Sequence, residues 1–161
     1  MKFARRAACM ATITAAALLL ASAAGAVQSD DADDQALVAD ADYAAGLAAL
    51  KGGDAAAALR RFQSALKRFP EAANLHNELG YSHRRLGQFD KAFEHYQRAL
   101  KIDPRHRGAH EYIGEAYLMA GDVAGAEKHL AALKSICLLP CDELKELQTA
   151  IAGHRAQNQA R

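Results

Sequence analysis

Apolar positions recur at helical spacing through the middle of the chain. Residues 73–86 are predicted to form one helix, because packing side chains occur there every three or four positions. These side chains are Leu75, Leu79, His83 and Leu86. Gly87 follows, and glycine is common just past a helix C-terminus. A second helix is predicted at about residues 90–102, before Pro104, because proline cannot continue a helix interior. The pattern predicts a helical hairpin.

The same hairpin pattern recurs along the chain at one fixed interval, which is typical of repeat proteins. The repeated positions are Gly46, Gly80 and Gly114; Gly53, Gly87 and Gly121; Ala58, Ala92 and Ala126; and Phe62, Tyr96 and Leu130. A glycine inside a helix costs about 1 kcal/mol relative to alanine, so its recurrence at one register indicates a close packing contact. We expect Gly80 to face Ala92 across the hairpin. We expect Phe62 and Tyr96 to fill the wider gap towards the next unit.

This period divides the chain into three hairpin units and a final helix. Unit one, unit two and unit three span about residues 39–72, 73–106 and 107–140. A stack of helical units needs a polar outer end. Residues 141–156 are predicted to supply it, because Leu144, Leu147 and Ile151 lie on one face of a helix that is charged elsewhere. A flexible tail is predicted at residues 157–161.

The repeated residues resemble the signature of the tetratricopeptide repeat (TPR) family. In unit two they are Leu79-Gly80, Gly87, Phe89, Ala92, Tyr96, Ala99-Leu100 and Pro104. The resemblance covers about residues 39–140 and is weakest in unit one, where small or acidic residues replace larger ones. It implies an all-α fold, a right-handed α-solenoid of three TPR hairpins plus a C-terminal capping helix. Residues 106–119, followed by a pair of cysteines, are also similar to small exported bacterial TPR proteins.

The N-terminus has the three parts of a secretory signal peptide. Residues 1–6 are basic, an uncharged run follows, and small residues that suit cleavage lie just before the acidic segment. We therefore expect residues 1–26 to be removed after about Ala23 or Ala26, and the protein to be exported to the periplasm. The alternative is an uncleaved anchor, since the uncharged run approaches the length that spans a bilayer. Residues 27–38 are predicted to be an acidic, flexible linker.

Charge and missing motifs narrow the possible functions. Removing residues 1–26 takes away three positive charges and no negative ones, so the formal net charge changes from +1 to −2. Such a nearly neutral chain is not suited to nucleic-acid binding through phosphate neutralisation. The sequence has no phosphate-binding glycine loop and no nucleophile elbow. Gly114 stands where a zinc-protease motif that begins at His110-Glu111 needs its second histidine. We expect no enzyme activity and no cofactor.

Two cysteines lie beyond the predicted leader, Cys137 and Cys141. An even number of cysteines near a turn favours a disulfide in an oxidising compartment, and Pro140 prevents one straight helix from running through both. The alternative is a redox-active or metal-binding pair, although the spacing differs from the C-x-x-C motif. The seven histidines form no pattern of two histidines with a carboxylate. We therefore expect no metal site.

In the TPR family the first helix of each unit lines an inner groove. The resemblance implies that the stripe of each first helix beside its packing residues binds a protein or peptide partner. The predicted groove residues are Tyr43, Asn77, Tyr81, Arg84, Arg85, Glu111, Glu115 and Met119. Tyrosine, arginine and methionine are enriched at protein interfaces. The alternative is that each is an ordinary solvated position on a helical surface.

The expected function is a non-catalytic interaction module, an adaptor or assembly factor of the bacterial cell envelope. Some family members clamp a C-terminal carboxylate with lysine, asparagine and arginine. Those groove positions are occupied here by Tyr43, Leu47, Glu78, Gly108 and Tyr112. The resemblance therefore does not imply a chaperone-tail ligand. The alternatives are a redox or metal-handling protein that uses Cys137 and Cys141, and a homo-oligomer formed through the first helix of unit one.

Overall fold

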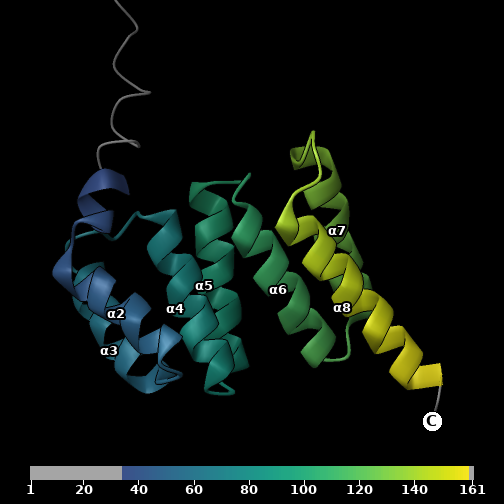
Figure 1. The fold of residues 1–161 in the computed structure, drawn as a ribbon, viewed down its shortest axis with the longest axis horizontal. Helices are drawn as coiled ribbons and strands as arrows, with labels where there is room; N and C mark the ends of the chain where they lie inside the picture. Colours follow the sequence, from purple (N-terminus) through teal and green to yellow (C-terminus); the bar gives the residue numbers. More distant parts are fainter. Residues whose placement is uncertain (1–33, 160–161) are drawn as a thin grey trace, which may run out of the picture.

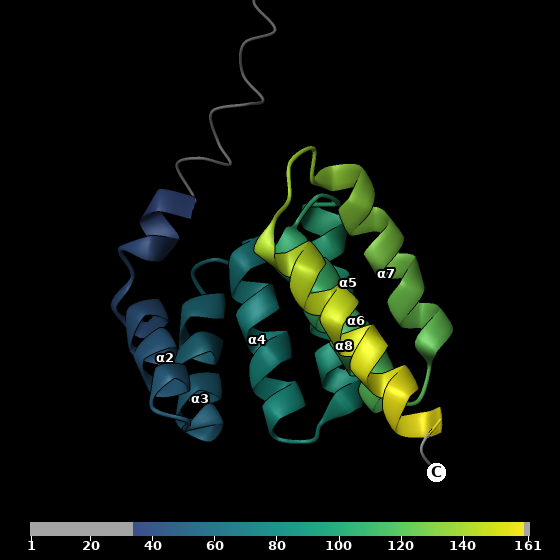
Figure 2. The same ribbon diagram turned by 45° about the vertical axis from the view of Figure 1, so that its right-hand side comes forward.

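The computed structural model describes residues 34–159, which form three helical hairpins followed by one further helix (Figure 1). The hairpins pair α2 (Ala41–Lys51) with α3 (Ala55–Leu66), α4 (Ala73–Arg85) with α5 (Phe89–Ile102), and α6 (Arg107–Met119) with α7 (Val123–Ile136). The last helix is α8 (Asp142–Gln159), which packs against α6 and α7 (Figure 2). The fold is the all-α solenoid that the sequence predicts. The predicted leader at residues 1–26 lies outside the described residues.

Each hairpin turns at a glycine with positive φ. The φ angles of Gly53, Gly87 and Gly121 are 81°, 71° and 82°, a region that residues with a Cβ atom rarely adopt. An aspartate then caps the second helix in two of the units. Asp54 accepts a hydrogen bond from the N–H of Ala57, and Asp122 accepts one from the N–H of Gly125, both at 2.8 Å. The repeated glycine is therefore the residue that ends each first helix.

The glycine in the middle of α4 faces a ring, and the prediction that it faces Ala92 was wrong. A Cβ atom at Gly80 would lie 2.6 Å from the ring of Tyr96. The ring of Tyr96 therefore packs back over the first helix of its own unit. Tyr96 also packs with Ile113 and Ala116 of α6. One aromatic side chain thus fills both the space within unit two and the space towards unit three.

Unit three fills the same space with a residue from the capping helix. In unit one, the ring of Phe62 lies directly over Gly46, as in unit two. In unit three, the nearest side chain to a Cβ at Gly114 is Leu147 of α8, at 2.7 Å. Leu147 is fully buried. The capping helix is therefore seated in a notch that only glycine leaves open.

Both ends of the described chain contain more helix than the sequence predicts. Residues 34–38 are helical, although they belong to the segment predicted as a flexible linker. The side chain of Leu37 is fully buried in the same cluster as Leu75 and Leu79. This burial explains why residues 34–38 are helical and not a flexible linker. At the other end α8 continues to Gln159, into the region predicted as a flexible tail.

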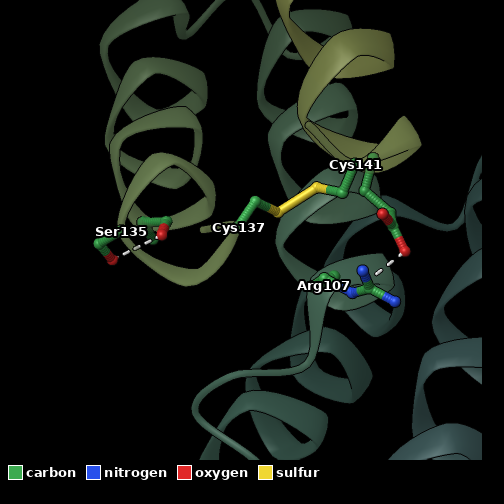
Figure 3. The surroundings of a disulfide bond; sticks show 6 residues. Arg107, Ser135, Cys137 and Cys141 are labelled. Atoms are coloured by element: carbon green, nitrogen blue, oxygen red, sulfur yellow. Dashed lines mark hydrogen bonds and ion pairs between the residues drawn. A yellow bond between two sulfur atoms is a disulfide. The ribbon is translucent and has the colours of Figure 1, made fainter. Parts of the chain in front are cut away.

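A disulfide joins the end of α7 to the start of α8. Cys137 and Cys141 are bonded, with their Cα atoms 6.1 Å apart (Figure 3), a separation within the normal range for disulfides. Beside it, the guanidinium of Arg107 in α6 lies 3.4 Å from a carboxylate oxygen of Glu143. The start of α8 is thus held by a covalent bond to α7 and an ion pair to α6.

Reducing this disulfide is expected to lower the free energy of unfolding by about 2 kcal/mol, because the bond closes a short loop in the unfolded chain. Urea unfolding followed by circular dichroism, with and without a phosphine reductant, measures the effect. The double variant Cys137→Ser/Cys141→Ser is the control, and its stability should not respond to the reductant. An unfolding midpoint of the unsubstituted protein that is unchanged by reduction would show that the bond is not stabilising.

Candidate functional site

The first helices of the units lie along one side of the solenoid. α4 lies against α6, and α6 lies against α8. Each of these helices buries one face against the second helices, as the burial of Leu79 and Ile113 shows. The side chains on their remaining faces form the surface where the sequence predicts a ligand groove.

The centre of this surface is a cluster formed around Arg84. Its guanidinium lies 5.2 Å from the ring centroid of Tyr81 and 5.5 Å from that of Tyr112, which are cation–π distances. Its Nη1 atom is 2.7 Å from a carboxylate oxygen of Glu115, and only 11% of the Arg84 side chain is exposed. We call Tyr81, Arg84, Tyr112 and Glu115 the Arg84 cluster. It joins α4 to α6 by contacts that fix the direction of the guanidinium.

The predicted groove residues divide into an accessible and a buried set. Met119 is 59% exposed, Arg85 is exposed, and Tyr81, Arg84 and Glu115 are half-buried. Tyr43, Asn77 and Glu111 are buried, so they support the surface and do not line it. Helical spacing did not place Tyr112 among the binding residues. The sequence places Tyr112 at the same repeat position as Glu78, since each lies two residues after one of the equivalent histidines His110 and His76.

Two carboxylates below the surface are shifted towards the neutral form. Burial raises the pKa of Glu78 to about 7, although the amide of Asn77 donates a hydrogen bond that partly offsets this. Burial also raises the pKa of Glu111, with further contributions from a hydrogen bond to Glu146 and from the nearby charge of Glu115. Neutralising these groups reduces the repulsion between neighbouring acids. The groove therefore carries less negative charge near neutral pH than its sequence suggests.

A hollow of about 410 Å³ adjoins the Arg84 cluster where α4, α6 and α8 meet. Its lining includes Arg84, Glu115, Leu118, Met119, Ala150 and His154. Apolar and charged groups are thus both within reach of one bound segment. A methionine is suited to such a place, because its flexible thioether adapts to different ligand shapes.

Residues 34–159 contain neither a candidate metal site nor a helix that could cross a membrane. No group of three or more histidine, cysteine, aspartate or glutamate side chains in this range is arranged to hold a metal ion. None of the helices in the same range combines the length and the apolar character needed to cross a membrane.

Comparison with known proteins identifies the repeats. Residues 43–107 and residues 83–136 each match a family described as tetratricopeptide repeat. A curated relative, the CTR9 homolog of Arabidopsis thaliana, is 31% identical over 84 residues. That match covers 52% of this chain and 8% of the relative, so the chain spans less than a tenth of its length.

Solved structures share the fold at low sequence identity. The TPR2B domain of yeast Sti1, in a complex with pHsp70, has a TM-score of 0.66 and 17% identity, covering 78% of this chain and 98% of that one. PcrH, in complex with the chaperone binding region of PopD, has a TM-score of 0.64 and 20% identity, covering 81% and 96%. The sequence matches and the shared architecture agree. Residues 43–136 of this chain are therefore tetratricopeptide repeats.

Proposed function

We propose that the protein is a non-catalytic adaptor or assembly factor of the bacterial cell envelope, which binds an extended peptide or a helix of a partner in its groove. The observation that carries this proposal is the Arg84 cluster beside its hollow. The arginine is held between two tyrosines and a glutamate before any ligand arrives. Such pre-organisation reduces the entropy lost on binding, and arginine and tyrosine frequently dominate interface energies.

Two similar folds support a peptide or protein ligand. The Sti1 domain was solved in a complex with pHsp70, and PcrH with the chaperone binding region of PopD. The positions of the family's carboxylate clamp hold Glu78, Gly108 and Tyr112 here. We therefore propose that the ligand is an internal segment of its partner and not a free C-terminus. The envelope location is supported by the leader-like sequence of residues 1–26.

A photocrosslinking residue at Met119 is expected to capture a discrete partner in cells, because this side chain is exposed at the edge of the hollow. The matched control is the same residue at Gln97, an exposed position on α5 outside the groove. Adding Arg84→Gln to the Met119 probe should reduce the captured adduct severalfold, since the guanidinium would no longer be present. Mass spectrometry identifies the adduct and its attachment site.

Equal labelling from positions 119 and 97 would contradict groove binding. Fractionation of the same cells tests the location separately. Recovery of the protein in the cytoplasm with residues 1–26 still attached would contradict the envelope assignment, whatever the crosslinks show.

A further inference from the structure

A polar pair joins the first and second helices of every unit at equivalent repeat positions. The pairs are Asp42–Arg61 in unit one, His76–His95 in unit two and His110–His129 in unit three. The unit-one pair is an ion pair at 3.2 Å. The histidine pairs bring two Nδ1 atoms to 3.1 Å and 2.9 Å. We call the two histidine pairs the clasps.

The ring geometry identifies each clasp as a hydrogen bond. The ring centroids of His76 and His95 are 5.3 Å apart, and those of His110 and His129 are 5.2 Å apart. These separations exceed the Nδ1–Nδ1 distances by about two ring radii, so each Nδ1 points along the line to the other. One proton on that line makes an N–H···N bond. A metal ion bound to both nitrogens would instead lie off the line and require the rings to be angled towards it.

A backbone carbonyl determines which ring donates. Nε2 of His76 lies 3.0 Å from the carbonyl oxygen of Pro70, and Nε2 of His110 lies 3.1 Å from that of Pro104. A carbonyl can only accept, so Nε2 carries the hydrogen and Nδ1 of the same neutral ring is an acceptor. The partner ring, His95 or His129, must then donate from Nδ1. The two clasps share one arrangement.

The number of protons on a clasp decides whether it can stay closed. With one added proton, His76 donates from both nitrogens and His95 accepts at Nδ1 after changing tautomer. The bond between the rings persists. With two added protons, both Nδ1 atoms are donors and two positive charges lie about 3 Å apart. The hydrogen bond is then lost and the rings repel each other.

The groups around the first clasp do not neutralise a second proton. The ring of His95 is stacked on that of His83, with the ring centroids 5.3 Å apart. Nδ1 of His83 is hydrogen-bonded to the side-chain oxygen of Gln88. Glu71 and Arg98 face His76 but form an ion pair with each other. Burial, followed by the charges of His76 and His83, lowers the pKa of His95 to about 4.

The second clasp has equivalent surroundings. Tyr117, the repeat equivalent of His83, is stacked on His129 with centroids 5.7 Å apart. Burial, followed by the charges of His110 and Lys128, lowers the pKa of His129 to about 4. His106, at the start of α6, is a titratable neighbour of His110, and its Nδ1 accepts a hydrogen bond from the N–H of Ala109. Within the described chain, no carboxylate is among the groups that shift the pKa of His129.

We propose that the two histidine pairs are proton-operated clasps, which release α4 from α5 and α6 from α7 when both rings of a pair are protonated, while the Asp42–Arg61 ion pair keeps unit one closed. The direction in which stability changes with pH follows from the pKa shifts of the clasp histidines. His95 and His129 have a pKa near 6.5 in the unfolded chain and about 4 in the folded protein, so the stability that they contribute is full above pH 6.5 and falls towards pH 4. Arg84 and Glu115 lie on the helices that would move. An effect on ligand binding rests on the proposed function, whereas the clasps themselves do not.

Unit one supplies the substitution that tests the proposal. The variants His76→Asp/His95→Arg and His110→Asp/His129→Arg introduce the unit-one pair into each clasp. Urea unfolding is measured from about pH 7.5 to about pH 4.5, with His154→Gln on α8 as the control. Over this range we expect the equilibrium constant for unfolding of the unsubstituted protein to rise by roughly 50- to 100-fold per clasp. Each grafted pair should remove its share of that rise, and the control should remove none. An unchanged pH dependence in the grafted variants would overturn the proposal.

A measurement on the unsubstituted protein does not depend on whether the variants fold. Long-range ¹H–¹⁵N correlation spectra at neutral pH report which nitrogen of each histidine carries the proton. We expect Nε2–H on His76 and His110, and Nδ1–H on His95 and His129. Nε2–H on all four rings, or four rings that titrate independently near the value of free histidine, would overturn the proposal. Neither test requires a ligand, so failure here is distinct from failure of the crosslinking experiment.

Discussion

Replacing Leu147 with alanine is expected to lower the free energy of unfolding by about 2–5 kcal/mol. Leu147 is fully buried and fills the notch at Gly114. Because the facing residue has no side chain, nothing nearby can expand into the cavity that alanine would leave. The loss should be concentrated in α8, because Ile151 is the one other buried residue of this helix.

Urea unfolding by circular dichroism measures the total loss, and limited proteolysis shows whether α8 is released first. The matched control is Gln148→Ala, an exposed position one residue along the same helix. If Leu147→Ala and Gln148→Ala unfold at the same urea concentration, α8 is not held by the notch.

Replacing Gly80 with alanine is expected to lower the free energy of unfolding by roughly 1–3 kcal/mol, through overpacking against Tyr96. The direction of this change is informative. Alanine is favoured over glycine within a helix by about 1 kcal/mol, so helix propensity alone would make the variant more stable. Gly153 on α8 gives the matched control, since nothing lies within 4 Å of a Cβ placed there. Gly153→Ala should therefore stabilise the protein while Gly80→Ala destabilises it.

The same urea titration serves both glycine variants. The double variant Gly80→Ala/Tyr96→Leu should recover part of the stability, because the smaller side chain leaves room for the methyl group. Stabilisation by Gly80→Ala alone would mean that the ring of Tyr96 moves aside at little cost.

The hairpins could be predicted from the sequence because glycine and proline set their ends. Unit two was predicted as helices at 73–86 and about 90–102, and the structure places them at Ala73–Arg85 and Phe89–Ile102. The partner of Gly80 could not be predicted in the same way. Helical spacing gives the face on which a residue lies, but not the direction in which a ring such as Tyr96 leans.

The groove was predicted only in outline, for a related reason. Asn77 and Glu111 lie at suitable positions on their own helices, yet both are buried in the folded chain. Glu111 is covered where its carboxyl meets Glu146 of α8, a contact that the spacing of α6 alone could not reveal. The pattern of a single helix cannot account for side chains contributed by its neighbours.

The clasps left a signal in the sequence that is clear only once the pairs are seen. His76 and His110 occupy equivalent positions of the repeat, and so do His95 and His129. The equivalent residues of unit one, Asp42 and Arg61, carry opposite charges. Three polar pairs at one repeat register therefore indicated a contact between the two helices of a hairpin. The protonation chemistry required the distances.

The notch at Gly114 also determines where this array of repeats could gain or lose a member. A duplicated copy of residues 73–106 inserted before unit three would bring its own ring to cover its own glycine, as Tyr96 covers Gly80. A copy added after residue 140 would separate Leu147 from Gly114 and leave both without a partner. Growth of such a protein by gene duplication is therefore compatible with its interior and not with its end. The helix that closes the array therefore fixes its last unit, while the number of units before it is free to change.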